Sequence, residues 1–274
     1  MITGECIQEL CDLYLGLTED LIWNPRIRQQ TDKHKDLLSI TSLWDNPVTL
    51  FCYGHRLSLF MEKLPLFKNP FILVSHNSDE QITDKYRCIA DHPKLLVWLA
   101  QNVLFEHPKL HWIPIGIANS MWAHGSLAAF NQPIPAIKSK DIYFYFNTAT
   151  NSAERDSCLH AAQRKGLSFG SPLRFKEYIA ELASHKYAIC PPGNGVDCHR
   201  FWECFYVGVI PILKRSYFTE QVAKQFQCVL LDNWTDLSVD TLLKDYKPPP
   251  IYSKLTIDHI RESVGKNSQI IYYP

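Results

Sequence analysis

Several features are missing from this 274-residue sequence, and each absence excludes a class of protein. No stretch approaches 18 uninterrupted apolar residues, so we expect no membrane-spanning helix. Neither sign of charge dominates, because 28 basic residues balance 28 acidic ones, and this balance argues against a nucleic-acid or anionic-membrane partner. The first residues, MITGECIQELCDLYLGL, contain acids and no basic region, so they do not resemble a signal peptide. Together these absences predict a soluble, cytoplasmic protein.

The nine cysteines lack C-x-x-C pairs, and their odd number does not indicate a disulfide framework. We therefore expect free thiols in a reducing compartment. A zinc site is the alternative for the one local cluster, which consists of Cys190, Cys198, His199 and Cys204. The spacing of this cluster fits no common zinc pattern, and core packing with ligand binding accounts for the same positions, so we expect no metal there.

The first half of the chain is predicted to alternate between strands and helices. Apolar residues at helical spacing indicate a helix within residues 1–22. The elements predicted next are a strand at 48–53, a helix at 56–64, a strand at 71–75, a helix at 92–102, and strands at 102–104 and 112–117. A strand, a helix and a second strand in this order are typical of an α/β domain with a parallel sheet.

A run of polar residues, SHNSDEQI, ends the strand predicted at 71–75. The carboxyl ends of parallel strands are where α/β proteins place their chemistry. The run either caps a helix or supplies a catalytic group, and the two roles are compatible. Asp79 is our candidate for a general base, with His76 as the next candidate. We interpret the turn Gly54-His55-Arg56 as an ordinary polar loop, with contact to a substrate as the alternative.

A linker is predicted at 130–140, FNQPIPAIKSK, because this segment has two prolines and little periodicity. It divides the chain into domains of 1–133 and 134–274. The second domain again alternates, with a strand at 141–146, helices at 152–165 and 171–184, a strand at 187–190, a helix from about 197, strands at 209–212 and 229–231, and a helix at 257–264. We expect this last helix to pack back onto the first domain.

The loop Pro-Pro-Gly-Asn-Gly joins the strand at 187–190 to the next helix. Gly193 and Gly195 flank Asn194, so the backbone there can adopt positive φ and approach a ligand closely. The amino end of the helix that follows favours an anion. We expect Asp197 at the helix start to serve as a cap or as a partner for sugar hydroxyls.

Three polar residues of this helix share one side. His199 and Arg200 stand beside the loop, and Glu203 lies one turn further along. A guanidinium suits phosphate oxygens, and a carboxylate can accept both hydroxyls of a ribose, so the pattern predicts a site for a nucleoside diphosphate. The alternative is a common strand-to-helix turn whose Arg200 and Glu203 form a surface pair.

A second candidate for phosphate binding is Arg155, in the first turn of the helix predicted at 152–165, with Asn151 as its possible cap. A basic residue in a first turn opposes the helix dipole, which indicates a nearby anion. That anion is either a pyrophosphate or a neighbouring carboxylate from Glu154, Asp156 or Glu177.

The stretch PPGNGVDCHRFWECFYVGVIPI resembles the donor-binding signature of exostosin-like glycosyltransferases. The matching residues are Pro191, Gly193, Arg200, Glu203, Gly208, Val209, Ile210 and Pro211. The match covers about thirty residues, and IPIGIAN at 113–119 is a weaker similarity of the same kind. The turn from Asn151 to Arg155 is similar to one in fucosyltransferase-like enzymes. The chain is much shorter than animal exostosins and resembles the compact viral and microbial members more closely, among them an algal-virus enzyme that transfers xylose.

The resemblance implies a GT-B fold, in which two Rossmann-like domains face each other across a cleft. It implies a nucleotide-sugar donor such as UDP-xylose, a glycan or glycoprotein acceptor, and inversion at the anomeric carbon. Because the chain has no D-x-D motif, we expect no cofactor and no metal, with cationic side chains stabilising the leaving group. A non-catalytic nucleotide- or sugar-binding protein is the alternative. A dehydrogenase or epimerase is disfavoured, because no G-x-G-x-x-G follows the first predicted strand.

Overall fold

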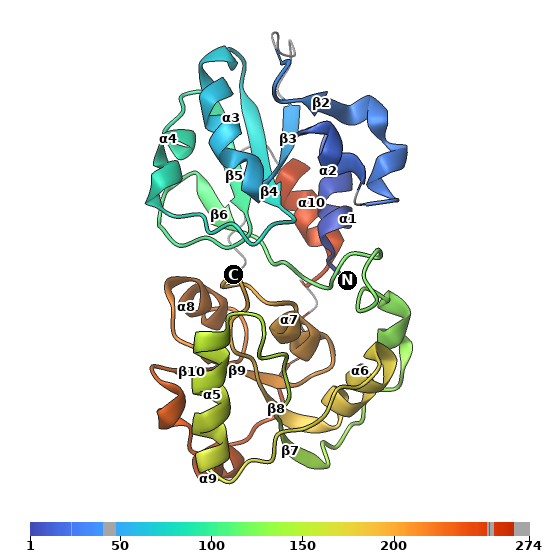
Figure 1. Cartoon of the computed structure of the whole chain (residues 1–274), viewed down its shortest axis with the longest axis vertical. Coiled ribbons are helices and arrows are strands. Elements are labelled where there is room, and N and C mark those ends of the chain that lie inside the picture. The colour runs from blue at the N-terminus through green and yellow to red at the C-terminus, as the bar shows by residue number, and fades with distance from the viewer. Residues whose placement is uncertain (23, 41–47, 251, 253–254, 266–274) are drawn as a thin grey trace. The chain divides into compact units, whose positions relative to one another are not determined.

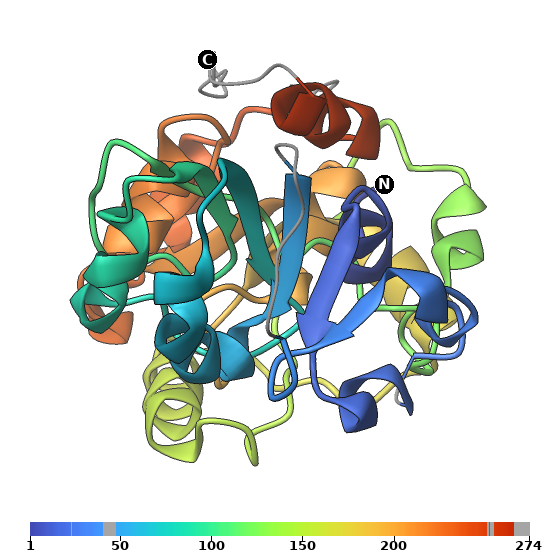
Figure 2. The ribbon, with the colours of Figure 1, turned by 90° about the horizontal axis from the view of Figure 1, so that it is seen from above.

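The computed structural model describes residues 1–22, 24–40, 48–250, 252 and 255–265. The chain divides into two compact units: unit 1 is Met1–Met121 with Lys254–Pro274, and unit 2 is Trp122–Ser253. The sequence-based boundary was placed later, between 133 and 134. Helix α10 (Ile257–Gly265), predicted at 257–264, belongs to unit 1, where it packs against α1 (Gly4–Glu9), as Figures 1 and 2 show.

Unit 1 is built on a parallel sheet whose described strands follow the order β2-β1-β3-β4-β5-β6. Its strands are β1 (Leu13–Gly16), β2 (His34–Asp36), β3 (Val48–Tyr53), β4 (Phe71–His76), β5 (Leu95–Ala100) and β6 (Leu110–Trp112). Its remaining helices are α2 (Thr18–Ile22), α3 (Leu57–Lys63) and α4 (Arg87–Ala90). Every residue of β4 is buried, as expected of a central strand with both faces covered.

The predicted helix at 92–102 was wrong, because Leu95–Ala100 forms strand β5 between β4 and β6. Its sequence, LLVWLA, is apolar throughout, and such a run fits a strand buried on both faces as well as a helix. Pairing with β4 decides between the two. Trp98 is fully buried, and its Nε1 donates to Ser75 Oγ of β4 at 2.8 Å.

Three other predictions in unit 1 need correction. Residues 1–22 are not one helix, because β1 separates α1 from α2 and pairs with β3. The strand predicted at 112–117 ends at Trp112, and Ile117 makes only an isolated bridge to Thr3. The strand predicted at 102–104 is likewise reduced to a bridge between Val103 and Ile82. In each case the secondary structure depends on whether the segment pairs with a strand that is distant in the sequence, and a local pattern of residues does not contain that information.

Unit 2 contains a second parallel sheet, with described strands in the order β10-β9-β8-β7. The strands are β7 (Lys140–Tyr143), β8 (His185–Ile189), β9 (Ile210–Lys214) and β10 (Val229–Leu231). The helices are α5 (Ser152–Arg164), α6 (Phe175–Ala183), α7 (His199–Tyr206), α8 (Tyr217–Ala223) and α9 (Val239–Lys244). Each predicted element of this unit is present: β10 has the predicted bounds, and the other elements differ from theirs by a few residues at one or both ends.

Helices cover both faces of the unit 2 sheet. Cys158, Ala161 and Ala162 of α5 pack with alternate strand residues such as Ile189 and Ile212 in one core cluster. Because successive strand residues point to opposite faces, the residues between them face the other layer, where α6 packs on β8 and α7 on β9. Figure 1 shows α5 and α7 on different sides of these strands.

The two units are therefore α/β structures with parallel sheets, consistent with Rossmann-like folds. Within the ranges that the structure describes, no helix has the length and apolar character needed to cross a membrane.

Candidate functional site

A polar pocket of about 650 Å³ lies in unit 1, where strands β3 and β4 end. It is lined by His55, Ser78, Asp79, Glu80, Gln81, Thr83 and Lys85. His55 comes directly after β3, and the other residues follow β4. The pocket thus occupies the carboxyl edge of a parallel sheet, and its volume lies in the range of about 300–1,000 Å³ typical of small-molecule sites.

Two asparagines in a left-handed conformation and a close approach of the turn after β3 fix the loop that follows β4. Asn77 and Asn102, each just beyond a strand, adopt left-handed φ values of 57° and 56°. Asn102 Nδ2 donates to the Ser78 carbonyl at 3.1 Å, and Ile82 N–H donates to the Asn102 carbonyl at 2.9 Å. At Gly54 an added Cβ would lie only 2.9 Å from Ser78 Cβ, so glycine lets the turn after β3 approach the loop.

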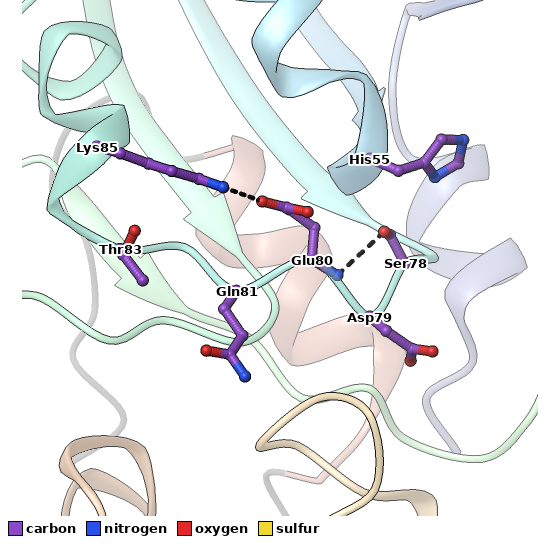
Figure 3. A pocket seen from close by; sticks show the side chains of 7 residues that line it. All are labelled: His55, Ser78, Asp79, Glu80, Gln81, Thr83 and Lys85. Carbon is purple, nitrogen blue, oxygen red and sulfur yellow. Dashed lines mark hydrogen bonds and ion pairs between the residues drawn. The ribbon is translucent and has the colours of Figure 1, made fainter. Parts of the chain in front are cut away.

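Four lining side chains form what we call the polar row: His55, Ser78, Glu80 and Lys85. Figure 3 shows Lys85, Glu80 and Ser78 following one another along the pocket with the His55 ring turned outward beyond Ser78, while Asp79 and Gln81 extend from the other side of the loop. Glu80 Oε1 accepts from Lys85 Nζ at 2.6 Å and from the Tyr86 hydroxyl at 2.7 Å. Burial would raise the pKa of Glu80, but these two hydrogen bonds outweigh it and lower the pKa.

The imidazole of His55 contacts the buried carboxylate of Asp20. Its Nε2 lies 3.2 Å from Asp20 Oδ1, and the histidine side chain is 46% exposed whereas that of Asp20 is 4% exposed. Asp20 also accepts from Arg56 and from the Leu17 N–H. Burial opposes ionisation of Asp20, but the hydrogen bonds from His55, Arg56 and Leu17 prevail and lower its pKa to about 2. Asp20 is therefore ionised at neutral pH and fixes the imidazole.

The two predicted proton acceptors occupy different environments. Asp79 is exposed and lines the pocket. His76 does not line it: the ring is 1% exposed, with Nε2 lying 3.1 Å from the Pro114 carbonyl and Nδ1 3.1 Å from Asn77 Oδ1. Burial lowers the pKa of His76 in spite of these contacts. A substrate hydroxyl cannot reach this ring without displacing protein atoms, so His76 acts in the packing of the loop.

In unit 2, two loops are joined by predicted donor-binding residues. Asn151 occupies the N-cap position of α5 with a left-handed φ of 51°, but its side chain makes no capping hydrogen bond and instead donates from Nδ2 to the Gly193 carbonyl at 2.9 Å. Arg155 donates from Nε to the Pro192 carbonyl at 3.0 Å and from Nη1 to the Asn147 carbonyl at 2.6 Å. The loops after β7 and β8 are thus brought together, as the predicted site requires.

Arg200 lies at the same edge of the sheet. Its guanidinium donates to the Tyr145 carbonyl just beyond β7, and it lies 5.5 Å from the ring centre of Tyr143 and 5.2 Å from that of Tyr178. Arg155 and Arg200 both donate to carbonyls of the segment that follows β7. Burial lowers the pKa of Arg155, and the Arg200 charge acts in the same direction. The pKa of Arg200 is raised in spite of burial, because Tyr178, Cys190, Tyr143 and Glu203 favour its charged form. Among the ion pairs between described residues, none includes either arginine.

The acids near the loop have partners inside the protein. Glu203 is 4% exposed and accepts from the Tyr178 hydroxyl at 2.6 Å. Burial raises its pKa, although the Tyr178 hydrogen bond and Arg200 act in the opposite direction. Asp197, also 4% exposed, accepts from Trp202 Nε1 at 2.6 Å, and the residue that caps α7 is Cys198 rather than Asp197. A ribose would have to displace Tyr178 to reach Glu203.

The glycine loop also differs from its prediction. The described glycines with left-handed φ are Gly116, Gly166 and Gly208, so neither Gly193 nor Gly195 adopts that conformation. Gly193 instead allows close packing, because an added Cβ would lie 3.4 Å from Arg155 Nη2. Asn194 is exposed, and the His199 ring centre lies 6.2 Å from that of His124. A small apolar slot of about 70 Å³, lined in part by Pro192, Phe201 and Leu213, adjoins the loop.

The cysteines of the local cluster contact one another and the glycine loop. Cys190 Sγ lies 3.9 Å from Cys204 Sγ, and the Cys198 thiol accepts from the Gly193 N–H at 3.0 Å. Burial raises the pKa of Cys198 to about 12, which keeps it a neutral thiol. In the part of the chain that the structure describes, no group of three or more His, Cys, Asp or Glu residues could hold a metal ion.

A scan against protein-family models and a search of curated proteins find no match to this chain. The His55–Asp20 pair is the feature that sequence reasoning missed, because the two residues are 35 positions apart and meet only when β1 and β3 pair. The sequence pointed to this position only through the turn Gly54-His55-Arg56, which we interpreted as an ordinary polar loop with substrate contact as the alternative, and His55 of this turn lines the pocket.

Proposed function

We propose that the chain is a glycosyltransferase that moves a sugar from a nucleotide-diphosphate donor to a glycan hydroxyl. Unit 2 binds the donor, and the pocket of unit 1 binds the acceptor. A UDP-sugar such as UDP-xylose is the donor that the exostosin-like resemblance favours. The proposal includes the GT-B arrangement, which requires that the carboxyl edges of the two sheets face one another.

The observation that carries the proposal is the neighbouring pair Arg155 and Arg200. Both guanidinium groups donate to carbonyls of the segment after β7, at the carboxyl edge of the sheet, and burial lowers the pKa of Arg155 with the Arg200 charge acting in the same direction. A diphosphate would supply the missing negative charge and accept hydrogen bonds from both guanidinium groups. The amino end of α7, directly after the loop, adds dipolar N–H groups.

The proposed reaction is a single displacement. The acceptor O–H bond breaks and its proton passes to a base in the unit 1 pocket, while the acceptor oxygen forms a bond to the anomeric carbon. The bond from that carbon to the diphosphate breaks, and its electron pair leaves with the nucleoside diphosphate. Asp79 is the proposed base, because it is exposed in the pocket whereas His76 is buried. Arg155 and Arg200 stabilise the leaving charge in the place of a metal.

A panel of UDP- and GDP-sugars tests donor binding by thermal shift, because a ligand at one hundred times its Kd stabilises a protein by about 2.7 kcal/mol. We expect one nucleotide class to stabilise the chain and Arg155→Met to weaken that binding at least tenfold. Arg174→Met is the matched control, since Arg174 is an exposed arginine bonded to Glu177 away from the loop. Stability of the free variants is measured in parallel, because Arg155 also joins two loops.

Release of free nucleotide, measured with and without added glycans, then separates the enzyme from a non-catalytic binder. An enzyme releases nucleotide faster when its acceptor is present, whereas a binding protein releases none. If no nucleotide sugar binds, or if Arg155→Met binds as tightly as the unaltered chain, the donor site is not where we place it.

A further inference from the structure

The side chains of the polar row in the unit 1 pocket are held by contacts with neighbouring protein groups. Asp20 holds His55, the Glu80 N–H donates to Ser78 Oγ at 3.2 Å, and Glu80 is held by Lys85 and Tyr86. The Lys85 ammonium also lies 4.7 Å from the Tyr86 ring centre. Side chains that are fixed in advance lose little entropy when they bind a ligand.

The chemistry of the row suits adjacent hydroxyl groups. An ammonium, a carboxylate and a hydroxyl follow one another along the pocket, and the imidazole of His55 lies at the end of this series with its ring turned outward (Figure 3). Together they offer alternating hydrogen-bond acceptors and donors, and a sugar hydroxyl can both donate and accept. The pocket volume of about 650 Å³ also leaves room for more than a single small group.

The charges of the pocket select against an anionic ligand. Among the described residues that line the pocket, Lys85 carries the one ammonium, and it pairs with Glu80 at 2.6 Å. Asp79 is a second acidic residue in the same lining. A saccharide that carries a carboxylate would therefore meet two acidic side chains and would have to compete with Glu80 for Lys85, whereas a neutral saccharide would not.

We propose that the polar row is a recognition subsite for adjacent hydroxyls of a neutral saccharide and that it is functionally separate from Asp79. The row positions the acceptor, and Asp79 handles the proton. As an account of the acceptor the inference rests on the proposed function, but binding of a saccharide to the row is measurable without any transfer. Glu80 and Lys85 together set the preference for a neutral ligand.

Ligand-observed NMR titrations of the full chain with methyl β-glucoside and methyl β-glucuronide test the inference, since these probes differ by one carboxylate. We expect the unaltered protein to bind the glucoside at least tenfold more tightly. Glu80→Gln leaves the Lys85 ammonium without its anionic partner, so the preference should shrink or reverse. Lys85→Met leaves Glu80 unpaired, so binding of the glucuronide should weaken further. His55→Gln should weaken binding of the glucoside about fivefold or more, because a hydrogen bond is lost.

Matched controls come from unit 1 itself. Glu62→Gln makes the same chemical change as Glu80→Gln on the exposed side of α3, outside the pocket lining. His107→Gln removes another histidine whose Nε2 lies 3.2 Å from an aspartate, Asp91, and which does not line the pocket. Both controls should bind the two glycosides as the unaltered protein does.

The inference is overturned if neither glycoside binds, or if Glu80→Gln and Lys85→Met leave the preference unchanged while the variants remain folded. It is also overturned if these variants lower kcat for transfer without changing the acceptor KM. If the glycosides bind as expected but no nucleotide sugar is ever turned over, the saccharide site stands and the transferase proposal fails.

Discussion

The two units differ in how they treat polar side chains at the carboxyl edge of the sheet: unit 1 directs them into a pocket, whereas unit 2 bonds several of them to the backbone or buries them. At the carboxyl edge of the unit 1 sheet, polar side chains line an open pocket of about 650 Å³. At the corresponding edge in unit 2 a small apolar slot of about 70 Å³ adjoins the loop after β8, and the guanidinium groups of Arg155 and Arg200 donate to backbone carbonyls. The acids Asp197 and Glu203 are buried against Trp202 and Tyr178.

This difference indicates which unit is ready for its ligand. In unit 1 the buried group, Asp20, supports an exposed one, His55, so the pocket keeps its shape without substrate. In unit 2 the arginines satisfy carbonyls of the two loops that they join, and a diphosphate would have to compete for these donors. We therefore expect binding of the donor to rearrange the loops after β7 and β8, whereas acceptor binding needs little change.

The largest expected effect is the loss of transfer in Asp79→Asn. If Asp79 takes the acceptor proton, removing its basicity should lower kcat by about 10²- to 10⁴-fold and leave donor binding unchanged. The control is Asp84→Asn, an aspartate nearby in the chain that bonds to Arg87 and does not line the pocket. Unchanged turnover in Asp79→Asn would transfer the role of base to another residue of the pocket.

Asp20→Asn should destabilise unit 1 in a pH-dependent way. The pKa of Asp20 is lowered from 3.8 to about 2 in the fold, so its ionised form stabilises the protein above pH 4 and that contribution is lost as the pH falls through about 2. We expect the variant to be less stable by about 2 kcal/mol at pH 7, and this difference to be largely lost below pH 2. Urea unfolding at the two pH values measures this, and a difference that is independent of pH would contradict it.

Glu203→Gln should have the smallest effect and the opposite sign. Burial raises the pKa of Glu203, so the wild-type protein loses stability as the pH rises from 4.5 through the raised pKa, and the uncharged glutamine does not. Because glutamine can still accept from Tyr178, we expect the change at pH 5 to stay within about 1 kcal/mol and to favour the variant increasingly above that. If nucleotide affinity falls tenfold instead, Glu203 holds the ribose and unit 2 opens further on binding than its contacts indicate.

Much of the fold followed from local pattern. Strands β3 at Val48–Tyr53 and β10 at Val229–Leu231 have the bounds predicted for them, because each is a short apolar run between turn residues. Helix α5 begins after Asn151 and is followed by Gly166 with a φ of 81°, as its capping residues predicted. The sequence pattern mispredicted two kinds of segment. The run that forms β5 is apolar throughout and so shows neither a helical nor a strand periodicity, and β1 is a strand because it pairs with segments that are distant in the sequence.

The site was predictable to a lesser degree. Placing Asp79 at a pocket, and Asn151, Arg155 and Arg200 at one edge of a sheet, needed only the rule that chemistry gathers where parallel strands end. The orientations of Glu203 and Asp197 were not predictable, because their partners Tyr178 and Trp202 are known only after the helices pack. The expectation of a positive φ at Gly193 was also wrong. A glycine can be needed for close packing instead, and the neighbour of Gly193, Arg155, is known only from the packed structure.

By itself the sequence determined that the chain forms α/β units with parallel sheets and which loops meet at the sheet edges, since apolar spacing and turn residues act locally. Only the tertiary structure decided which polar side chains remain exposed. His55 stays accessible because Asp20, 35 residues earlier, holds it at the surface, whereas Glu203 is withdrawn to Tyr178. Burial and pairing are properties of the packed chain, and no local pattern of residues contains them.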